Sequence, residues 1–178
     1  LNAARQGKAV AFFSVEMSKE DNVIRLLSMI SGIEADRIRV KGTTRGERDR
    51  LEAAQKELES LPITIEYCGS DTIEDIRAKA QALYKQGKLA VLFIDYLNLI
   101  NIVVSKSNLQ ETTDLALGNI ARKIKLMAEE MQIPIVLLAQ MNRESDRRPA
   151  PHFPILSDLR NSGAIEQIAD VVAFVYRA

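Results

Sequence analysis

Three polar residues follow apolar runs of the chain, at positions where a nucleotide hydrolase would need them. Glu16 comes shortly after residues 8–14 (KAVAFFS), Asp95 directly after residues 89–94 (LAVLFI), and Gln140 directly after residues 133–139 (IPIVLLA). Apolar runs of this length are typical of buried parallel strands. Ligands of open α/β sheets bind outside the carboxyl ends of the strands, so these three side chains are the candidates for chemistry.

Each of the three has a chemical role and an ordinary alternative. Asp95 has the form of a Walker B acid, which holds Mg²⁺ directly or through water because this hard cation prefers oxygen ligands; it could equally cap a helix or form a turn. Glu16 could act as the general base for the water that attacks a terminal phosphate, or be a solvated acid near the start of the next helix. The Gln140 amide could contact the terminal phosphate or cap a neighbouring backbone group.

Helix signals alternate with the apolar runs. Ser18 resembles an N-cap with an acid three residues on, and it opens a helix that Gly32 is expected to end. Further helices are expected at about 44–60, 72–86, 110–131 and 164–167, with a short helical piece at 37–40. Additional strands are expected at 63–67 and 170–176. The alternation predicts a largely parallel sheet covered by helices on both faces.

Composition narrows the function classes. The 178 residues fit one domain, and 24 basic residues balance 24 acidic ones, so any contact with nucleic acid must be local. No apolar run approaches the roughly 18 residues that span a bilayer, and the start of the chain has no signal pattern, so we expect a cytoplasmic protein without membrane contact. The one cysteine, Cys68, is expected to be a small buried apolar residue in a reducing compartment.

Taken together and in order, the motifs resemble those of DnaB-type replicative helicases over essentially the whole chain. The block at residues 157–167 (SDLRNSGAIEQ) is the most distinctive of them. The segments that carry the resemblance are Phe13–Ser18 (FSVEMS), Phe93–Leu97 (FIDYL), Ala139–Arg143 (AQMNR), Ser157–Gln167 and Ala169–Val172 (ADVV).

The resemblance implies a fold, cofactors and partners. The fold would be a RecA-like three-layer α/β/α sandwich with a mostly parallel central sheet, binding ATP and Mg²⁺. The family's members act as homo-hexamers on single-stranded DNA and engage a primase and a helicase loader. By position, Glu16 resembles the catalytic glutamate, Asp95 the Walker B aspartate that holds Mg²⁺, and Gln140 the glutamine that couples phosphate state to DNA.

The block around Arg160, Asn161 and Gly163 resembles the loop that grips single-stranded DNA in the central channel. Backbone amides and a guanidinium can hold phosphates without reading bases, so such contact would be sequence-tolerant. Arg160 could instead be a surface partner of Asp158. Two positions depart from the family pattern, since Asn161 stands where an acid is usual and Ile168 where an acidic or polar residue is usual.

A phosphate-binding loop of the form GxxxxGK[ST] is absent from the sequence. From the resemblance, we expect the chain to be one RecA-like helicase core domain, residues 1–178, whose phosphate-binding loop lies upstream and whose arginine finger lies downstream. As it stands, the chain is expected not to turn over ATP. The favoured interpretation is the ATP-driven motor of a hexameric helicase. The alternatives are a non-catalytic RecA-like assembly or regulatory module, or another ATPase of the RecA superfamily.

Overall fold

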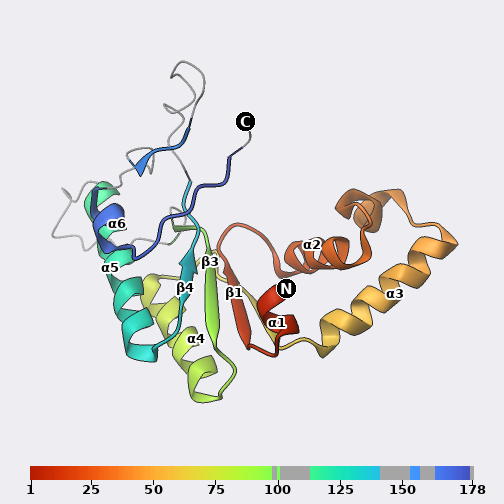
Figure 1. Ribbon diagram of the computed structural model, residues 1–178, viewed down its shortest axis with the longest axis horizontal. Helices are drawn as coiled ribbons and strands as arrows, with labels where there is room; N and C mark the ends of the chain where they lie inside the picture. Colours follow the sequence, from red (N-terminus) through yellow and green to blue (C-terminus); the bar gives the residue numbers. More distant parts are fainter. Residues whose placement is uncertain (98–99, 101–112, 141–152, 157–162, 177–178) are drawn as a thin grey trace.

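The chain forms a parallel four-stranded sheet between helices (Figure 1). The structure, a computed structural model, describes residues 1–97, 100, 113–140, 153–156 and 163–176. Its elements are, in chain order, α1 (Asn2–Arg5), β1 (Val10–Ser14), α2 (Lys19–Ser31), a π-helical turn η1 (Arg37–Lys41), α3 (Arg45–Ser60), β2 (Ile63–Tyr67), α4 (Ile73–Lys85), β3 (Val91–Asp95), α5 (Thr113–Met131), β4 (Ile135–Leu137) and α6 (Gly163–Ile168).

The strands lie in the order β2-β1-β3-β4, and each neighbouring pair is parallel. The register aligns Phe12 with Ile65 on one side and with Phe93 on the other, and it aligns Phe93 with Val136. Because all four strands run the same way, their carboxyl ends meet at one edge, the upper edge in Figure 1. The expected α/β sandwich with a parallel central sheet is confirmed.

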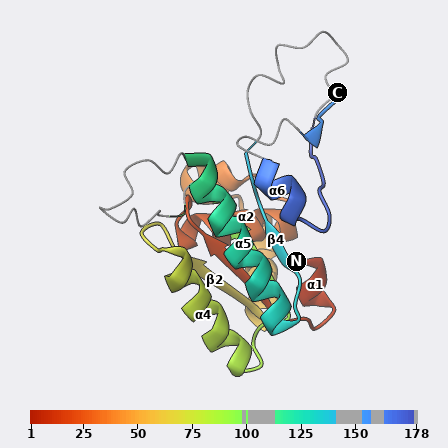
Figure 2. The ribbon, with the colours of Figure 1, turned by 90° about the vertical axis from the view of Figure 1, so that its left-hand side faces the viewer.

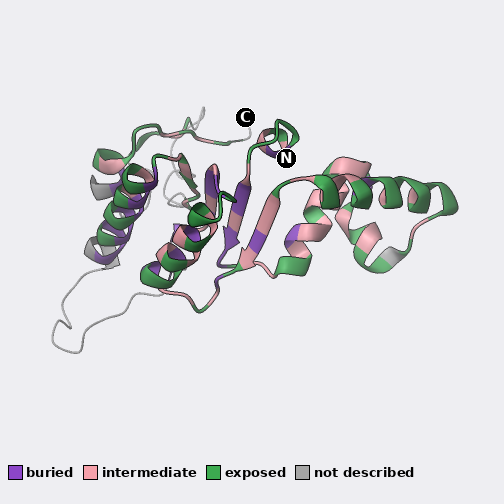
Figure 3. Cartoon of the chain, turned by 90° about the horizontal axis from the view of Figure 1, so that it is seen from below, coloured by how far each residue is buried: buried purple, intermediate pink, exposed green. Residues whose placement is uncertain are grey.

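One face of the sheet carries the main core. Side chains of β1 and β3 such as Phe13, Leu92 and Ile94 are fully buried there, against α4 and α5. The inner faces of these two helices contribute Ile76 and Met127, which are also fully buried. Figure 2 shows α4 and α5 side by side over this face, and Figure 3 shows their buried residues turned towards the sheet. Apolar stripes at helical spacing therefore account for this layer.

The other face of the sheet is covered less completely. Near α1, Ala4, Val10 and Val91 form a small buried cluster. Further across, the rings of Phe12 and Phe93 stack at 6.4 Å between centroids and are only half-buried. On β4 the same face ends in Val136, which is 42% exposed. Burial on this face thus falls from β1 towards β4.

Helix ends follow the signals in the sequence. The Ser18 side chain accepts a hydrogen bond from the Asp21 amide at 3.1 Å, and Gly32 ends α2 with φ +69°, a backbone region that favours glycine. Reciprocal capping boxes open α3 at Thr44 and α4 at Thr72. These local interactions fix where α2 begins, and hence the length of the loop that carries Glu16.

Cys68 is buried, as expected, with 1% of its surface exposed. Burial raises the pKa of its thiol to about 12, since an apolar setting disfavours the thiolate. The thiol therefore packs as an apolar group and stays protonated at neutral pH.

One expected strand is absent from the described residues, and another is shorter and less buried than expected. Residues 170–176 do not form a strand: the described residues 171–176 have no assigned secondary structure, and Val171 and Val175 are 84% and 95% exposed. The apolar run lacks a ladder partner among the described residues, and a strand is stable only with one. The run at 133–139 does form β4, but over Ile135–Leu137 alone, and its outer face is open rather than buried.

Within the described ranges, no helix is long and apolar enough to cross a membrane.

Candidate functional site

The carboxyl ends of β1, β3 and β4 are held together by backbone hydrogen bonds. The Val15 amide donates to the Asp95 carbonyl at 2.6 Å, which joins the segment before Glu16 to the end of β3. On the other side of β3, the Leu97 amide donates to the Leu138 carbonyl at 3.0 Å. The backbone therefore places Glu16, Asp95 and the residues after β4 on three neighbouring strands.

All three residues selected from the sequence line one cavity at this edge. The cavity has a volume of about 310 Å³ and is lined by Glu16, Asp95, Tyr96, Leu138, Ala139 and Gln140. Glu16 and Gln140 are exposed, whereas Asp95 is half-buried. A ligand in this cavity would thus meet two carboxylates and one amide from different strands.

A second, larger cleft of about 560 Å³ adjoins the first. It shares Glu16, Asp95 and Leu138 with the cavity and extends over α2 and η1. Its further lining residues are Met17, Asp21, Arg25, Ala35, Asp36 and Arg39. Charged side chains therefore continue from the strand ends onto α2.

Two buried polar residues shape the loop that carries Glu16. Ser14 is completely buried, and its hydroxyl oxygen accepts a hydrogen bond from the Met17 amide at 3.0 Å. Asn22, 6% exposed on α2, donates from its side-chain amide to the carbonyls of Met17 at 3.3 Å and Ser18 at 2.9 Å. Together they hold the peptide groups on both sides of Met17, so they fix the position of Glu16 without contacting the cavity.

The electrostatics of the site favour a bound cation. Burial, and secondly the negative charge of Glu16, raise the pKa of Asp95 above its ordinary value, while Arg25 acts in the opposite direction. Carboxylate oxygens are the protein ligands that Mg²⁺ prefers, and Mg²⁺ is commonly held by one or two carboxylates together with phosphates and water. The part of the chain that the structure describes has no group of three or more His, Cys, Asp or Glu suited to a metal. Asp95 and Glu16 therefore fit Mg²⁺ that arrives with a phosphate ligand, and do not form an all-protein metal cage.

The candidate DNA-binding block is described only at its end. Arg160 and Asn161 lie outside the described residues, and Gly163 is the first residue of α6. This helix is anchored: Ile165 is 9% exposed in the main core, and Lys125 of α5 is ion-paired with Asp170 at 2.6 Å. The segment that follows the block is thus fixed to α5, while its DNA contact stays a prediction.

Sequence reasoning missed three residues of this site. From the sequence, Ser14 is only the last residue of an apolar run, and Asn22 and Arg25 have no predicted role. A signal existed for Asn22 alone, because asparagine is disfavoured inside helices unless its side chain bonds to nearby backbone groups. Ser14 and Arg25 could be found only from the folded structure.

A parallel α/β sheet with an acid after each of two strands and an amide after a third has the arrangement that a nucleotide hydrolase would need at the carboxyl edge of its strands. Comparison with known proteins makes the assignment specific. The family model for the DnaB-like helicase C-terminal domain matches residues 1–178. The chain therefore belongs to the DnaB-like helicase family.

Its relatives include replicative DNA helicases of two bacteria. The chain is 37% identical over 171 residues to the replicative DNA helicase DnaB of Rickettsia bellii, covering 96% of this chain and 33% of that protein. With the replicative DNA helicase DnaB of Geobacillus stearothermophilus it shares 35% identity over 175 residues, covering 98% of this chain and 38% of that protein. The chain thus spans about a third of the length of these relatives.

Solved structures show the same fold. A DnaB-like replicative helicase whose interactions with primase were determined superimposes with a TM-score of 0.89 at 28% identity, covering 99% of this chain and 42% of that one. A solved ATPase domain superimposes with a TM-score of 0.90, also at 28% identity, over 99% of this chain and 62% of that one.

Proposed function

We propose that this chain is the motor core of a hexameric replicative helicase, which couples ATP hydrolysis to movement on single-stranded DNA and to duplex unwinding. The observation that carries the proposal is the convergence of Glu16, Asp95 and Gln140 on one cavity at the carboxyl edge of the sheet. In this proposal the complete protein works in the cytoplasm, as a ring of six with a primase and a loader as partners.

Each side chain has one task in the proposed reaction. Exposed Glu16 accepts a proton from the water that attacks the terminal phosphate. Asp95 holds Mg²⁺, which supplies positive charge to the phosphate oxygens when bound. Gln140 lies on the far side of the cavity from α2, and its amide forms a hydrogen bond to the terminal phosphate. When that phosphate leaves, this hydrogen bond is lost, and the change is transmitted to the residues that follow β4.

Glu16→Gln in the complete protein tests the catalytic part. The substitution keeps the shape of the side chain but removes its capacity to take a proton, so hydrolysis should fall by about a hundred- to ten-thousand-fold while nucleotide binding and ring assembly persist. Glu74→Gln, at an exposed position of α4, is the matched control and should keep full turnover. Near-normal hydrolysis by the Glu16 variant would remove Glu16 from the mechanism.

The same measurement separates the motor from a non-catalytic module. Magnesium-dependent ATP hydrolysis by the unmodified complete protein is required by the motor, and its absence would favour the RecA-like assembly or regulatory module.

Arg160→Ala tests the proposed DNA contact made by Arg160, Asn161 and Gly163. Loss of a phosphate contact should weaken binding of single-stranded DNA similarly for all sequences and reduce its dependence on salt. Unchanged affinity at physiological salt would contradict a role in gripping the strand.

A further inference from the structure

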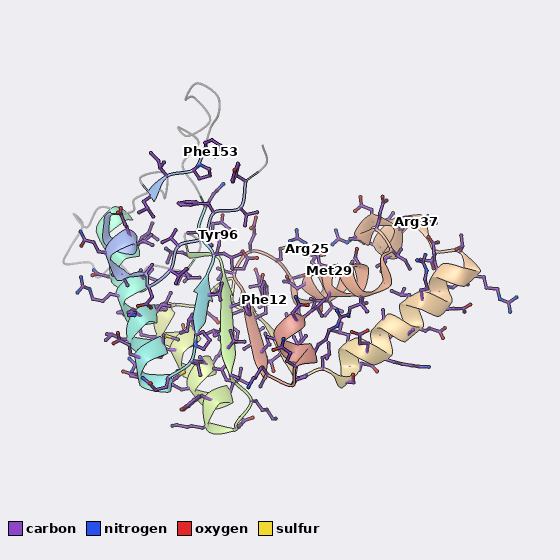
Figure 4. All side chains as sticks on the ribbon, viewed as in Figure 1. Phe12, Arg25, Met29, Arg37, Tyr96 and Phe153 are labelled. Atoms are coloured by element: carbon purple, nitrogen blue, oxygen red, sulfur yellow. The ribbon has the colours of Figure 1, made fainter. Side chains whose placement is uncertain are left out.

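Arg25 is a cation of the larger cleft to which the mechanism above gives no task. It lies two turns into α2, the helix that begins just after Glu16, and its side chain is exposed. Figure 4 shows Arg25 at the same edge of the molecule as Tyr96, which follows β3. Arg25 therefore approaches the strand ends from the side of α2.

The charges around the cleft are unequal. Its lining includes four acids, Glu16, Asp21, Asp36 and Asp95, but two arginines, Arg25 and Arg39. Arg39 is ion-paired with Asp21. Arg25, by contrast, makes no hydrogen bond or ion pair with any described residue, so among the described lining residues it is the guanidinium left for a ligand.

The two hollows define where a ligand of Arg25 would lie. Gln140 lines the first and Arg25 the second, while Glu16 and Asp95 line both. A group bound beside Glu16 and Asp95 thus has the amide of Gln140 on one side and the guanidinium of Arg25 on the other. Guanidinium groups bind phosphate oxygens through two parallel charge-assisted hydrogen bonds. Because a phosphate adds negative charge beside two carboxylates, it would bind here only together with a cation.

We propose that Arg25 binds the terminal phosphate of the magnesium-bound nucleotide and makes the site prefer a triphosphate to a diphosphate. This inference rests on the proposed function, since it assumes that the cavity takes ATP. It adds a residue on α2 that contacts the terminal phosphate directly, opposite to Gln140, which follows β4.

The test compares two nucleotides in the complete protein with Mg²⁺ present. Binding of ADP and of a non-hydrolysable ATP analogue is measured by displacement of a fluorescent nucleotide, for the unmodified protein, Arg25→Gln and Arg25→Lys. Arg25→Gln should weaken binding of the ATP analogue about ten- to hundred-fold and change ADP binding less than about two-fold, because ADP lacks the contacted group. Arg25→Lys keeps the positive charge but cannot form two parallel hydrogen bonds, so it should recover part of the lost affinity for the ATP analogue.

Arg77→Gln is the matched control, because it removes the same charge from α4, where Arg77 pairs with Glu130 at 2.6 Å. Equal weakening of both nucleotides by Arg25→Gln would show a structural role and overturn the proposal, as would unchanged preference for the triphosphate. Both results leave the proposed function standing if the unmodified protein hydrolyses ATP. Failure of the unmodified protein to bind either nucleotide would refute the proposed function itself and the Arg25 contact with it.

Discussion

The loop that carries Glu16 should be stabilised jointly by Ser14 and Asn22. Ser14→Ala removes the acceptor of the Met17 amide inside a fully buried site, which should lower the free energy of unfolding by about 1–3 kcal/mol. Asn22→Ala removes two donated hydrogen bonds, at about 1 kcal/mol each, so its cost should be about 2 kcal/mol.

The two effects should not add. Both side chains form hydrogen bonds to the peptide groups next to Met17. Once one side chain is removed, the loop is less ordered, so the hydrogen bonds of the other contribute less to the free energy of unfolding. We expect the double variant to be less destabilised than the sum of the single variants by at least about 0.5 kcal/mol. Ser60, whose hydroxyl donates to the Glu57 carbonyl at 2.7 Å on exposed α3, is the control. Ser60→Ala should cost under about 0.5 kcal/mol and add independently to Ser14→Ala.

Urea denaturation followed by far-ultraviolet circular dichroism measures these energies, because the chain has no tryptophan to report by fluorescence. In the complete protein, ATP turnover by Ser14→Ala should also fall, since a displacement of about 1 Å can cost about a hundred-fold in rate. Strict additivity of Ser14→Ala and Asn22→Ala, or full turnover by both single variants, would refute the joint role.

Three further predictions concern stability. Gly46→Ala in the first turn of α3 has open space for the new methyl group and should stabilise the chain by about 0.5–1 kcal/mol in urea denaturation. Gly32→Ala, at φ +69°, should destabilise it. If both variants changed the free energy of unfolding in the same direction, the backbone explanation would be wrong. Thr72→Ala should cost about 1 kcal/mol by removing the capping box of α4, and Thr72→Ser should restore most of it, so equal losses in the two variants would contradict capping. Burial and Glu16 raise the pKa of Asp95, so the folded chain holds this proton more tightly than the unfolded chain does. The stability that this group contributes is therefore present below its ordinary pKa and lost as pH rises through the folded value. Asp95→Asn should therefore stabilise the magnesium-free chain at neutral pH but not in acid, while abolishing ATP turnover. Destabilisation at neutral pH would show that the surroundings do not disfavour the charged carboxylate.

The fold was predictable where local interactions decide it. Ser18 and Gly32 mark the start and the end of α2, because a hydroxyl cap and a left-handed glycine interact only with residues a few positions away. The strand expected at 170–176 failed for the opposite reason. Its apolar pattern fits a strand, but a strand also needs a neighbouring strand to bond with, and the sequence of the segment does not specify that neighbour.

The candidate site shows the same division. Glu16, Asp95 and Gln140 could be selected because each follows an apolar run, and parallel strands bring such residues to one edge. The hydrogen bonds of Ser14 and Asn22 were not predicted, because a serine at a strand end and an asparagine in a helix each have several possible partners, and only the folded structure shows that both bond next to Met17. Arg25 is separated from Asp95 by seventy residues of sequence, and no spacing rule links them.

The open outer face of β4 also bears on how the chain behaves in solution. β4 is a short strand at the edge of the sheet, with Val136 and Leu138 exposed beside it. In the apolar run 171–176, Val171, Val175 and Tyr176 are likewise exposed, and the run has no ladder bonds among the described residues. An edge strand and an exposed apolar segment of high strand propensity can pair between molecules, which is the first step of aggregation. Purified alone at high concentration, this chain is therefore a candidate for self-association through its strands, and added charge at Val171 or Val175 is the most direct way to keep it in solution.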